Sequence, residues 1–208
     1  YILNNNFKKY FNNYDFHNLY KELLNFCTVD LSAFYFDIRK DNLYCDDKES
    51  DKRKSTIKVL NIILNSLLRW FAPILSFTTE EIYKLLFKNK KSIHLEKFLE
   101  IPKKFQNEKV NNKWSELIKI RNICNISIEE KRASKEIGSS LEADLKIQLS
   151  QKLKNITENT DFSELCITSK AEVCYKDDIE TKAITSKAQG TKCPVCWKIN
   201  DGPCPRHS

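Results

Sequence analysis

The sequence predicts a mainly α-helical protein, a helical bundle followed by a small α+β subdomain and a C-terminal zinc knuckle. Apolar residues recur every three or four positions through most of the first 138 residues, as in amphipathic helices. Strict alternation of apolar and polar residues follows, which is typical of a half-buried strand. Two close pairs of metal-ligand residues come last. We therefore expect a bundle at residues 1–138, a subdomain at 139–188 and a knuckle at 189–208.

The first amphipathic pattern covers residues 7–27, where Leu19 and Leu23 share one helical face. Residues 31–38 continue in similar character, and Asp41-Asn42 indicates a turn. A clearer helix is predicted at residues 55–71.

Pro73 should end or kink the helix at 55–71, because proline lacks the backbone donor. Thr78 then resembles an N-cap, with Glu81 three residues later to complete a capping box and a hydrophobic staple between Phe77 and Ile82. The next helix is therefore expected at residues 79–87.

A fourth long helix is predicted at residues 111–137, and Gly138 is a natural residue to end it. Alternation over 141–149 predicts a strand, followed by a helical turn at 151–156. Further strands are expected at the positions of three shorter alternating runs: 164–168, 171–176 and 181–186.

Composition indicates an ordinary soluble globular protein: of 208 residues, 41% are apolar and 30% charged, with a net charge of +7. No apolar run is long enough to span a membrane, and no secretory leader is visible. The chain lacks Met and starts at Tyr1, so we expect a C-terminal piece of something longer. Five scattered cysteines resemble reduced thiols, which favours the cytoplasm; they are Cys27, Cys45, Cys124, Cys166 and Cys174.

The C-terminal ligand pairs are Cys193 with Cys196 and Cys204 with His207, each separated by two residues. This spacing lets one tight turn present two ligands to a tetrahedral Zn²⁺ ion. Four protein ligands leave no open position for water, so we expect one structural zinc. Two disulfides or idle thiols are the alternative.

Signals for catalysis are nearly absent. The sequence has no Gly-rich phosphate loop and no nucleophile elbow. With His207 assigned to the metal, His17 and His94 remain, and both are interpreted as surface or satisfied histidines. By itself this chain is not expected to catalyse a reaction.

Nucleic-acid binding is the better-supported class. Lys131, Arg132 and Lys135 cluster near the end of the fourth helix and could contact phosphates, although a salt-bridged surface is the alternative. Trp197 lies among cations at the knuckle, where it could stack on an unpaired base or pack over the zinc. The neighbouring cations are Lys192, Lys198 and Arg206. A further basic stretch contains Lys84, Lys88, Lys90, Lys91 and Lys97.

Five motifs together resemble the C-terminal region of bacterial-type isoleucyl-tRNA synthetase. They occur in the family's order and cover nearly the whole chain: residues 30–45, 69–82, 92–96, 132–143 and 192–197. The resemblance implies a class I anticodon-binding bundle followed by a tRNA-contacting zinc finger, with Cys193, Cys196, Cys204 and His207 as ligands. The family commonly has Cys as the fourth ligand and a longer loop between the pairs.

The parent enzyme implied by the resemblance is a class I isoleucine–tRNA ligase, cytoplasmic and monomeric. It charges tRNA(Ile) using ATP and Mg²⁺ and edits mischarged tRNA, in catalytic and editing domains upstream of Tyr1. The present chain would contribute tRNA binding and positioning. A free-standing zinc-stabilised nucleic-acid-binding or regulatory protein is the alternative. A protein-interaction module is a third possibility.

Overall fold

The computed structural model describes residues 1–88 and 91–207, so Lys90 of the predicted basic stretch lies outside the described residues. The chain divides into two compact units, Tyr1–Gln106 and Asn107–Ser208. Each unit is described by itself. Among the described helices, none is both long and apolar enough to cross a membrane.

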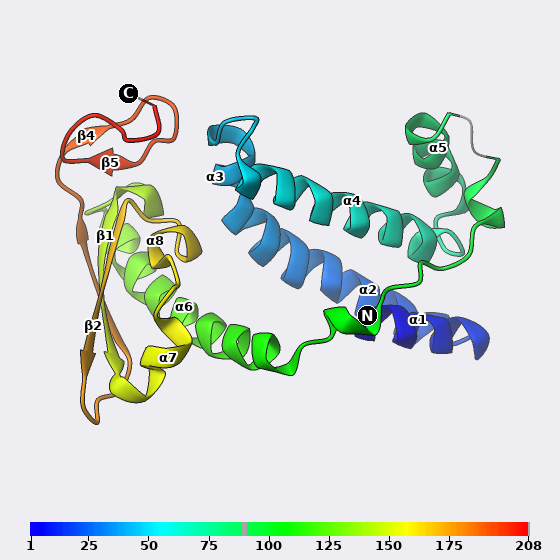
Figure 1. The fold of residues 1–208 in the computed structure, drawn as a ribbon, viewed down its shortest axis with the longest axis horizontal. Helices are drawn as coiled ribbons and strands as arrows, with labels where there is room; N and C mark the ends of the chain where they lie inside the picture. The colour runs from blue at the N-terminus through cyan, green and yellow to red at the C-terminus, as the bar shows by residue number, and fades with distance from the viewer. Residues whose placement is uncertain (89–90, 208) are drawn as a thin grey trace. The chain divides into compact units, whose positions relative to one another are not determined.

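The first unit is helical; its earlier helices run back and forth along one direction, and the last helix lies across them (Figure 1). A π-helix, Phe26–Phe36, joins two of these helices without interruption, and a connector with two short 3₁₀ turns, Ile93–Leu95 and Lys103–Phe105, follows the last of them. The α-helices are α1 (Ile2–Asn12), α2 (Phe16–Asn25), α3 (Asp37–Cys45), α4 (Asp51–Phe71) and α5 (Ser76–Leu86).

The single helix predicted at residues 7–27 is wrong, because the chain breaks between α1 and α2. Tyr14 adopts a left-handed conformation with φ of 56° at the break. Asp15 then caps α2 by accepting a hydrogen bond from the backbone N–H of Asn18 at 3.2 Å. No Gly or Pro marks this position, so the sequence pattern could not show it.

The turn predicted at Asp41-Asn42 is also wrong. Both residues lie inside α3, where Asn42 is only 2% exposed. The amide of Asn42 donates to Asp46 at 3.0 Å, one helical turn later. A polar pair that is typical of turns is thus accommodated by a local side-chain hydrogen bond within a helix.

Helix α4 confirms the prediction at residues 55–71 but starts one turn earlier, after Ser50. It ends before Pro73, as expected. The capping box at Thr78 is wrong, because the turn after Pro73 is tighter than expected and α5 starts at Ser76 without a side-chain cap. Thr78 and Glu81 therefore lie inside the helix. The hydrophobic staple is absent as well, since Phe77 is 93% exposed.

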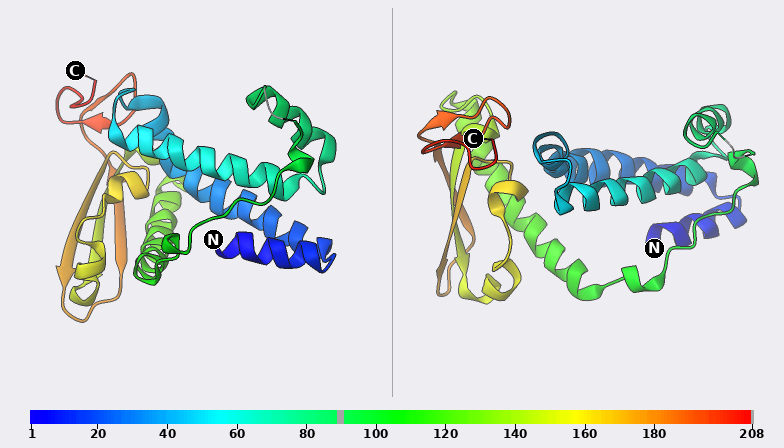
Figure 2. Two further views of the ribbon diagram at one scale, coloured as in Figure 1. Left: turned by 45° about the vertical axis from the view of Figure 1, so that its right-hand side comes forward. Right: turned by 45° about the horizontal axis from the view of Figure 1, so that its top comes forward.

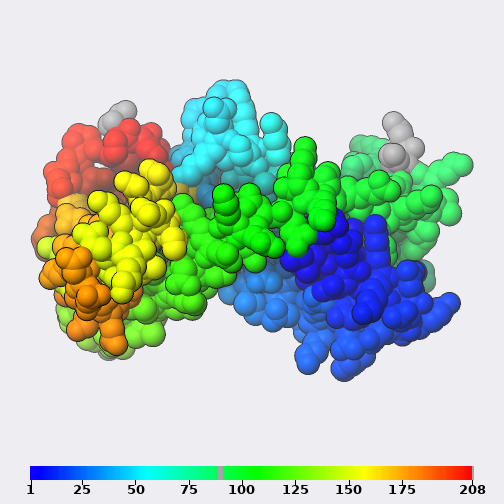
Figure 3. Space-filling view, turned by 60° about the horizontal axis from the view of Figure 1, so that its bottom comes forward, coloured from blue at the N-terminus to red at the C-terminus, as the bar shows by residue number. Residues whose placement is uncertain are grey.

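The core of the first unit is centred on Phe7, Leu19, Leu23 and Trp70. The rings of Phe7 and Trp70 meet edge to face at 4.8 Å. The indole N–H of Trp70 donates to the side-chain oxygen of Asn4 at 3.0 Å, so the one polar atom of this ring is satisfied inside the core. In Figure 3 α1 and α2, in dark blue, lie on the side of the first unit that faces the viewer.

The second unit is α+β. Its three-stranded sheet has the order β2–β1–β3, with β2 parallel and β3 antiparallel to the central strand. Helix α6 packs on β1 and β3, and Figure 2 shows it lying along one face of this sheet. The elements are α6 (Glu108–Ala133), β1 (Ala143–Ser150), α7 (Lys154–Thr157), α8 (Phe162–Leu165), β2 (Lys170–Lys176) and β3 (Lys182–Lys187).

The strands predicted at 141–149, 171–176 and 181–186 are confirmed as β1, β2 and β3, and the helical turn at 151–156 is confirmed too. The alternating side chains of β1 that face α6 are fully buried, which explains why its pattern was clear. The strand predicted at 164–168 is wrong, because α8 covers its first two residues and a turn follows at 166–167. Asp161 caps α8 by accepting from the backbone of Glu164 at 3.1 Å, a helix signal stronger than a short alternation.

Helix α6 ends at Ala133 and not at Gly138 as predicted. Lys135, with φ of 59°, takes the left-handed conformation that usually favours glycine. Its N–H donates to Arg132 and the next N–H donates to Lys131, so the last carbonyls of the helix are satisfied. The domain boundaries expected at 138 and 188 stay predictions. The division of the structure into compact units falls elsewhere, between residues 106 and 107.

Candidate metal centre and nucleic-acid interface

The C-terminal knuckle is built on a short hairpin of β4 (Thr191–Lys192) and β5 (Ile199–Asn200). Gly190 enters it with φ of +125°, and a Cβ added there would lie 2.2 Å from the carbonyl oxygen of Asn200. Only glycine fits this approach. The N–H of Cys193 donates to Lys198 and the N–H of Trp197 donates back to Cys193, which closes the loop that carries the first ligand pair.

The four predicted metal ligands come together. Ligand atoms of Cys193, Cys196, Cys204 and His207 all lie within 4.8 Å of one another. The His207 Nδ1 atom is 3.5 Å from the Cys193 sulfur and 3.4 Å from the Cys204 sulfur. The sulfurs of Cys196 and Cys204 are 3.8 Å apart. Zn–S bonds of about 2.3 Å in a tetrahedron put sulfurs about 3.8 Å apart, so this cluster could hold a metal ion.

The environment of Cys193 favours the thiolate that a metal needs. Its pKa is lowered to about 6, first by a hydrogen bond from the backbone N–H of Cys196 and further by Val195 and His207. A thiolate held by backbone donors is a better metal ligand than a neutral thiol. The donor set and its spacing therefore match structural zinc chemistry.

Two polar contacts attach the knuckle to residues around the start of β2, and a third supports the first of them. The backbone N–H of Ile199 donates to the Ser169 hydroxyl at 2.6 Å, and that hydroxyl donates to the carbonyl of Leu141. Lys170 forms an ion pair with Asp201 at 2.6 Å. Because the knuckle has almost no apolar core of its own, these contacts fix its orientation on the second unit.

Trp197 is held outward at the knuckle. Its backbone φ is 63°, a conformation that costs a non-glycine residue energy, and its side chain is 60% exposed. The ammonium of Lys192 lies 5.9 Å from the centre of the indole ring. An exposed aromatic ring beside a cation suits stacking with an unpaired base.

The cations at the end of α6 differ in their availability. Lys131 is paired with Glu136 at 2.9 Å, and Arg132 with Glu129 at 2.7 Å. Lys135 is exposed, and within the described residues no ion pair of its side chain is seen. A shallow hollow of about 460 Å³ lies beside it, lined by Glu129, Arg132, Ala133, Lys135, Ile137 and Gly138.

Glu142 connects this turn with the knuckle, a role that sequence reasoning missed. One carboxylate oxygen accepts from the backbone N–H of Gly138 at 2.9 Å, and the other lies 4.0 Å from the ammonium of Lys192. The motif at residues 132–143 could have indicated this contact, because it places the Glu142 carboxylate only four residues after Gly138. Of the two remaining predicted contacts, Lys198 donates to Ser163 at 3.5 Å, and Arg206 is exposed.

The remaining histidines and cysteines show no arrangement for catalysis among the described residues. His94 is exposed and lies 3.2 Å from the carbonyl of Ser76, while His17 is an exposed residue of α2. Cys124 and Cys166 are buried between α6 and α8, where hydrogen bonding to Cys124 and burial raise the pKa of the Cys166 thiol. Cys174, by contrast, is exposed on β2.

A helical unit joined to a small α+β unit with a Cys₃His knuckle fits one class of protein. The sequence model of the family described as the anticodon-binding domain of tRNA ligase matches residues 2–149. The chain belongs to this family. The fold class and the family expected from the sequence are thereby confirmed.

The curated relatives sharpen this assignment. The chain is 68% identical over 208 residues to the isoleucine–tRNA ligase of Pelagibacter ubique, covering all of this chain and 23% of that protein. It is 38% identical over 199 residues to the isoleucine–tRNA ligase of Bartonella henselae, covering 90% and 20%. The corresponding ligase of Agrobacterium fabrum is 36% identical over 197 residues, covering 89% and 20%.

The chain thus spans about a fifth of the length of the curated relatives it matches. These relatives give no support to the alternative of a free-standing regulatory protein, because each is named as a ligase.

Proposed function

We propose that this chain is the tRNA-binding part of an isoleucine–tRNA ligase. The observation that carries the proposal is the 68% identity to such a ligase along the entire chain. ATP- and Mg²⁺-dependent aminoacylation and editing would belong to upstream domains of the same cytoplasmic, monomeric polypeptide. The chain itself would bind tRNA(Ile) and position it. The proposed domains are the bundle at 1–138, the subdomain at 139–188 and the knuckle at 189–208.

Within the knuckle, Cys193, Cys196, Cys204 and His207 would hold one structural Zn²⁺ ion. The sulfur separations and the lowered pKa of Cys193 support this assignment. With four protein ligands the ion has no position for substrate, so its role is to keep the loop that carries Trp197 in shape.

The RNA-contacting residues proposed in the second unit fall into two neighbouring groups. Lys131, Arg132 and Lys135 surround the turn after α6, and Lys192, Trp197, Lys198 and Arg206 lie on the knuckle. Glu142 lies near both groups, which supports treating them as one surface. Lys135 and Trp197 are the strongest candidates, because both side chains are exposed. Both residues also hold left-handed backbone conformations, which a smaller residue would adopt at lower cost.

Binding to tRNA tests the proposal directly. The affinity of the chain for an isoleucine tRNA transcript is compared with that for a transcript with a swapped anticodon, across a salt series. We expect preference for the matching anticodon. Equal, purely salt-driven binding to both transcripts would contradict anticodon reading.

Lys135 offers a sharper test of the surface. Lys135→Asn removes the cation while keeping a residue that tolerates the left-handed backbone. We expect weaker binding to both transcripts and a salt slope reduced by about one, because one phosphate contact releases about one counterion. Lys135→Arg is the matched control and should keep the slope. An unchanged slope in Lys135→Asn would remove this residue from the interface.

A further inference from the structure

One end of the helical unit is unusually apolar for a free surface. Figure 1 shows the α1–α2 turn and the α4–α5 turn at the same end. Exposed aromatic and aliphatic side chains gather on these turns and on the connector beside them. We call this surface the apolar end, and it consists of Phe11, Tyr14, Phe16, Leu75, Phe77 and Leu95.

The aromatic part of the apolar end is ordered. The Phe11 ring meets Phe16 at 6.0 Å and Phe98 at 5.8 Å, both edge to face. Tyr14 continues the row, 6.4 Å from Phe16, and is 82% exposed. Its left-handed backbone places a large ring at a position where Gly or Asn would be less strained. Such a cost is retained where the side chain has a use.

A cleft of about 660 Å³ opens at the same end. It lies between the end of α1, the end of α4 and the connector. Its lining comprises Lys8, Phe11, Asn12, Arg69, Ala72, Pro73, Ile93, His94, Glu96, Lys97, Phe98 and Glu100.

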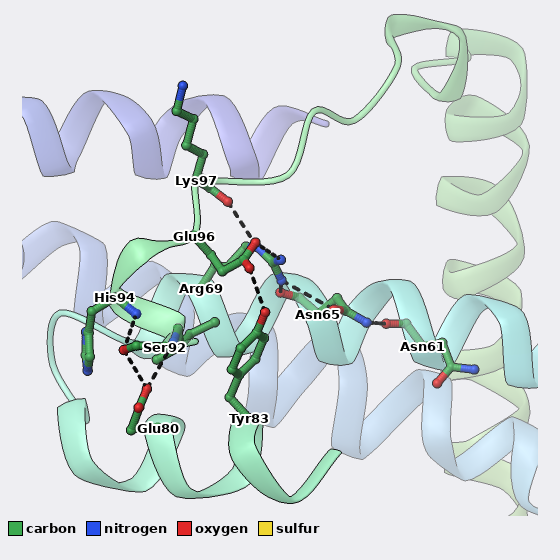
Figure 4. A network of polar contacts seen from close by, with 10 residues as sticks. Asn61, Asn65, Arg69, Glu80, Tyr83, Ser92, His94, Glu96 and Lys97 are labelled. Atoms are coloured by element: carbon green, nitrogen blue, oxygen red, sulfur yellow. Dashed lines mark hydrogen bonds and ion pairs between the residues drawn. The ribbon is translucent and has the colours of Figure 1, made fainter. Parts of the chain in front are cut away.

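The wall of this cleft is held rigidly by polar contacts, shown in Figure 4. Arg69 is mostly buried and pairs with Glu96 at 3.1 Å, while its remaining N–H groups donate to the carbonyls of Lys97 and Asn65. The Tyr83 hydroxyl donates to the same carboxylate at 2.7 Å. The connector is thereby fixed against α4 and α5, so the cleft is formed before any partner arrives.

The charges favour a protein partner over a nucleic acid. Three cations of the lining, Lys8, Arg69 and Lys97, are opposed by two carboxylates, Glu96 and Glu100, and the buried pair neutralises itself. Little net positive field remains to attract phosphates. Exposed large apolar side chains beside a preformed cleft are typical of a protein-binding site.

We infer that the apolar end, on the α1–α2 and α4–α5 turns, is the docking surface for the upstream catalytic part of the same polypeptide. This inference rests on the proposed function. The chain makes up 23% of its Pelagibacter relative, so more than three quarters of that ligase lies outside the matched region. Such a body has to be held in a fixed position relative to this unit if both act on one tRNA, and a direct contact would hold it there. The covered surface would be the α1–α2 and α4–α5 turns.

Chemical labelling of the full-length ligase tests this. Tyr14→Cys and Tyr44→Cys are a matched pair, because each tyrosine is 82% exposed, and α3, which carries Tyr44, ends at the opposite end of the unit (Figure 1). Maleimide labelling is read by peptide mass spectrometry, which separates the introduced thiols from native ones. Without tRNA, we expect the thiol of Tyr14→Cys to react at least tenfold more slowly than that of Tyr44→Cys. Phe77→Cys is a second probe of the same surface and should be protected too.

Labelling of Tyr14→Cys and Phe77→Cys as fast as Tyr44→Cys would overturn the inference. Protection that arises only when tRNA is added would overturn it as well and would assign the surface to RNA. Protection that rises with protein concentration would indicate a second copy and would also contradict it. The proposed function is judged separately by tRNA binding of the same preparation. Protection without tRNA binding would leave the docking surface standing and refute the function.

Discussion

The bundle and the knuckle hold their surfaces in place by different physical means. The bundle buries large side chains around Trp70 and Phe7, and the indole N–H of Trp70 is paired with Asn4 inside this core. The knuckle buries little besides Ile199 and its own cysteines. Its shape depends on Gly190, on backbone hydrogen bonds across the hairpin, and on four ligands that face one point.

The difference shows why a short segment needs a metal. Below about 40 residues a chain cannot bury enough apolar surface to offset the entropy of folding. The structural zinc proposed for the knuckle would supply that free energy locally, whereas the bundle obtains it from packing. The two regions should therefore respond to different perturbations.

Metal removal should have the largest effect and should act on the knuckle alone. Structural zinc contributes apparent binding energies of about 10–16 kcal/mol in comparable small domains. We expect Cys196→Ser or chelation to expose the knuckle to trypsin at Lys192, Lys198 and Arg206 while the bundle stays protected. Limited proteolysis with mass spectrometry measures this.

Cys174→Ser is the control for metal removal, because Cys174 is exposed and lies outside the cluster. It should leave the proteolysis pattern unchanged. Loss of protection in the bundle after chelation would show that the two regions are not independent.

A core substitution should have an intermediate effect and should act on the bundle alone. Leu23 is fully buried, so Leu23→Ala should lower the free energy of unfolding by about 2–5 kcal/mol through lost burial and a cavity. Leu24→Ala is the matched control, since its side chain is 44% exposed. Urea denaturation followed by helical circular dichroism measures both. Equal losses in the two variants would contradict the position of the core.

The smallest effect should come from a surface carboxylate of the bundle. The Lys84 ammonium, followed by the Ser92 hydroxyl, lowers the pKa of Glu80 to about 2. Because the folded-state pKa lies below its ordinary value of 4.5, this carboxylate stabilises the fold above pH 4.5. That contribution is lost as the pH falls towards 2.

Glu80→Gln should therefore be less stable than the original chain at neutral pH, and the difference should shrink between pH 4.5 and 2. Thermal unfolding across this range measures it, with Glu81→Gln as the neighbouring control. A difference that persists unchanged at pH 2 would indicate that hydrogen bonding to Ser92, and not charge, is responsible.

The sequence predicted those features whose signal is local and complete. The metal cluster was found because ligand pairs two residues apart need only one turn each. Strand β1 was found because its whole inner face is buried, which gives strict alternation. Helix α4 was found because its apolar residues recur at helical spacing and proline ends it.

Features set by tertiary context were missed. Tyr14 and Lys135 take left-handed conformations that glycine usually marks, so the break after α1 and the end of α6 had no sequence signal. The start of α5 depends on the turn that follows Pro73, and the nearby Thr78 was misleading. The apolar end was invisible because its residues are far apart in the sequence and meet only through the packing of α1 and α4.

The π-helix between α2 and α3 has a consequence for chain length. A π-turn closes on the fifth residue, so it accommodates about one residue more than an α-turn. Phe26–Phe36 therefore stores extra length inside one uninterrupted rod. Deletion of one residue there can be absorbed by reverting a π-turn to α geometry, because a turn of either kind is about one full rotation and α3 then keeps nearly the same rotation relative to α2. Natural insertions and deletions are expected to concentrate in this segment, and those that survive will be the ones that leave the rotation of Tyr44 and its neighbours unchanged.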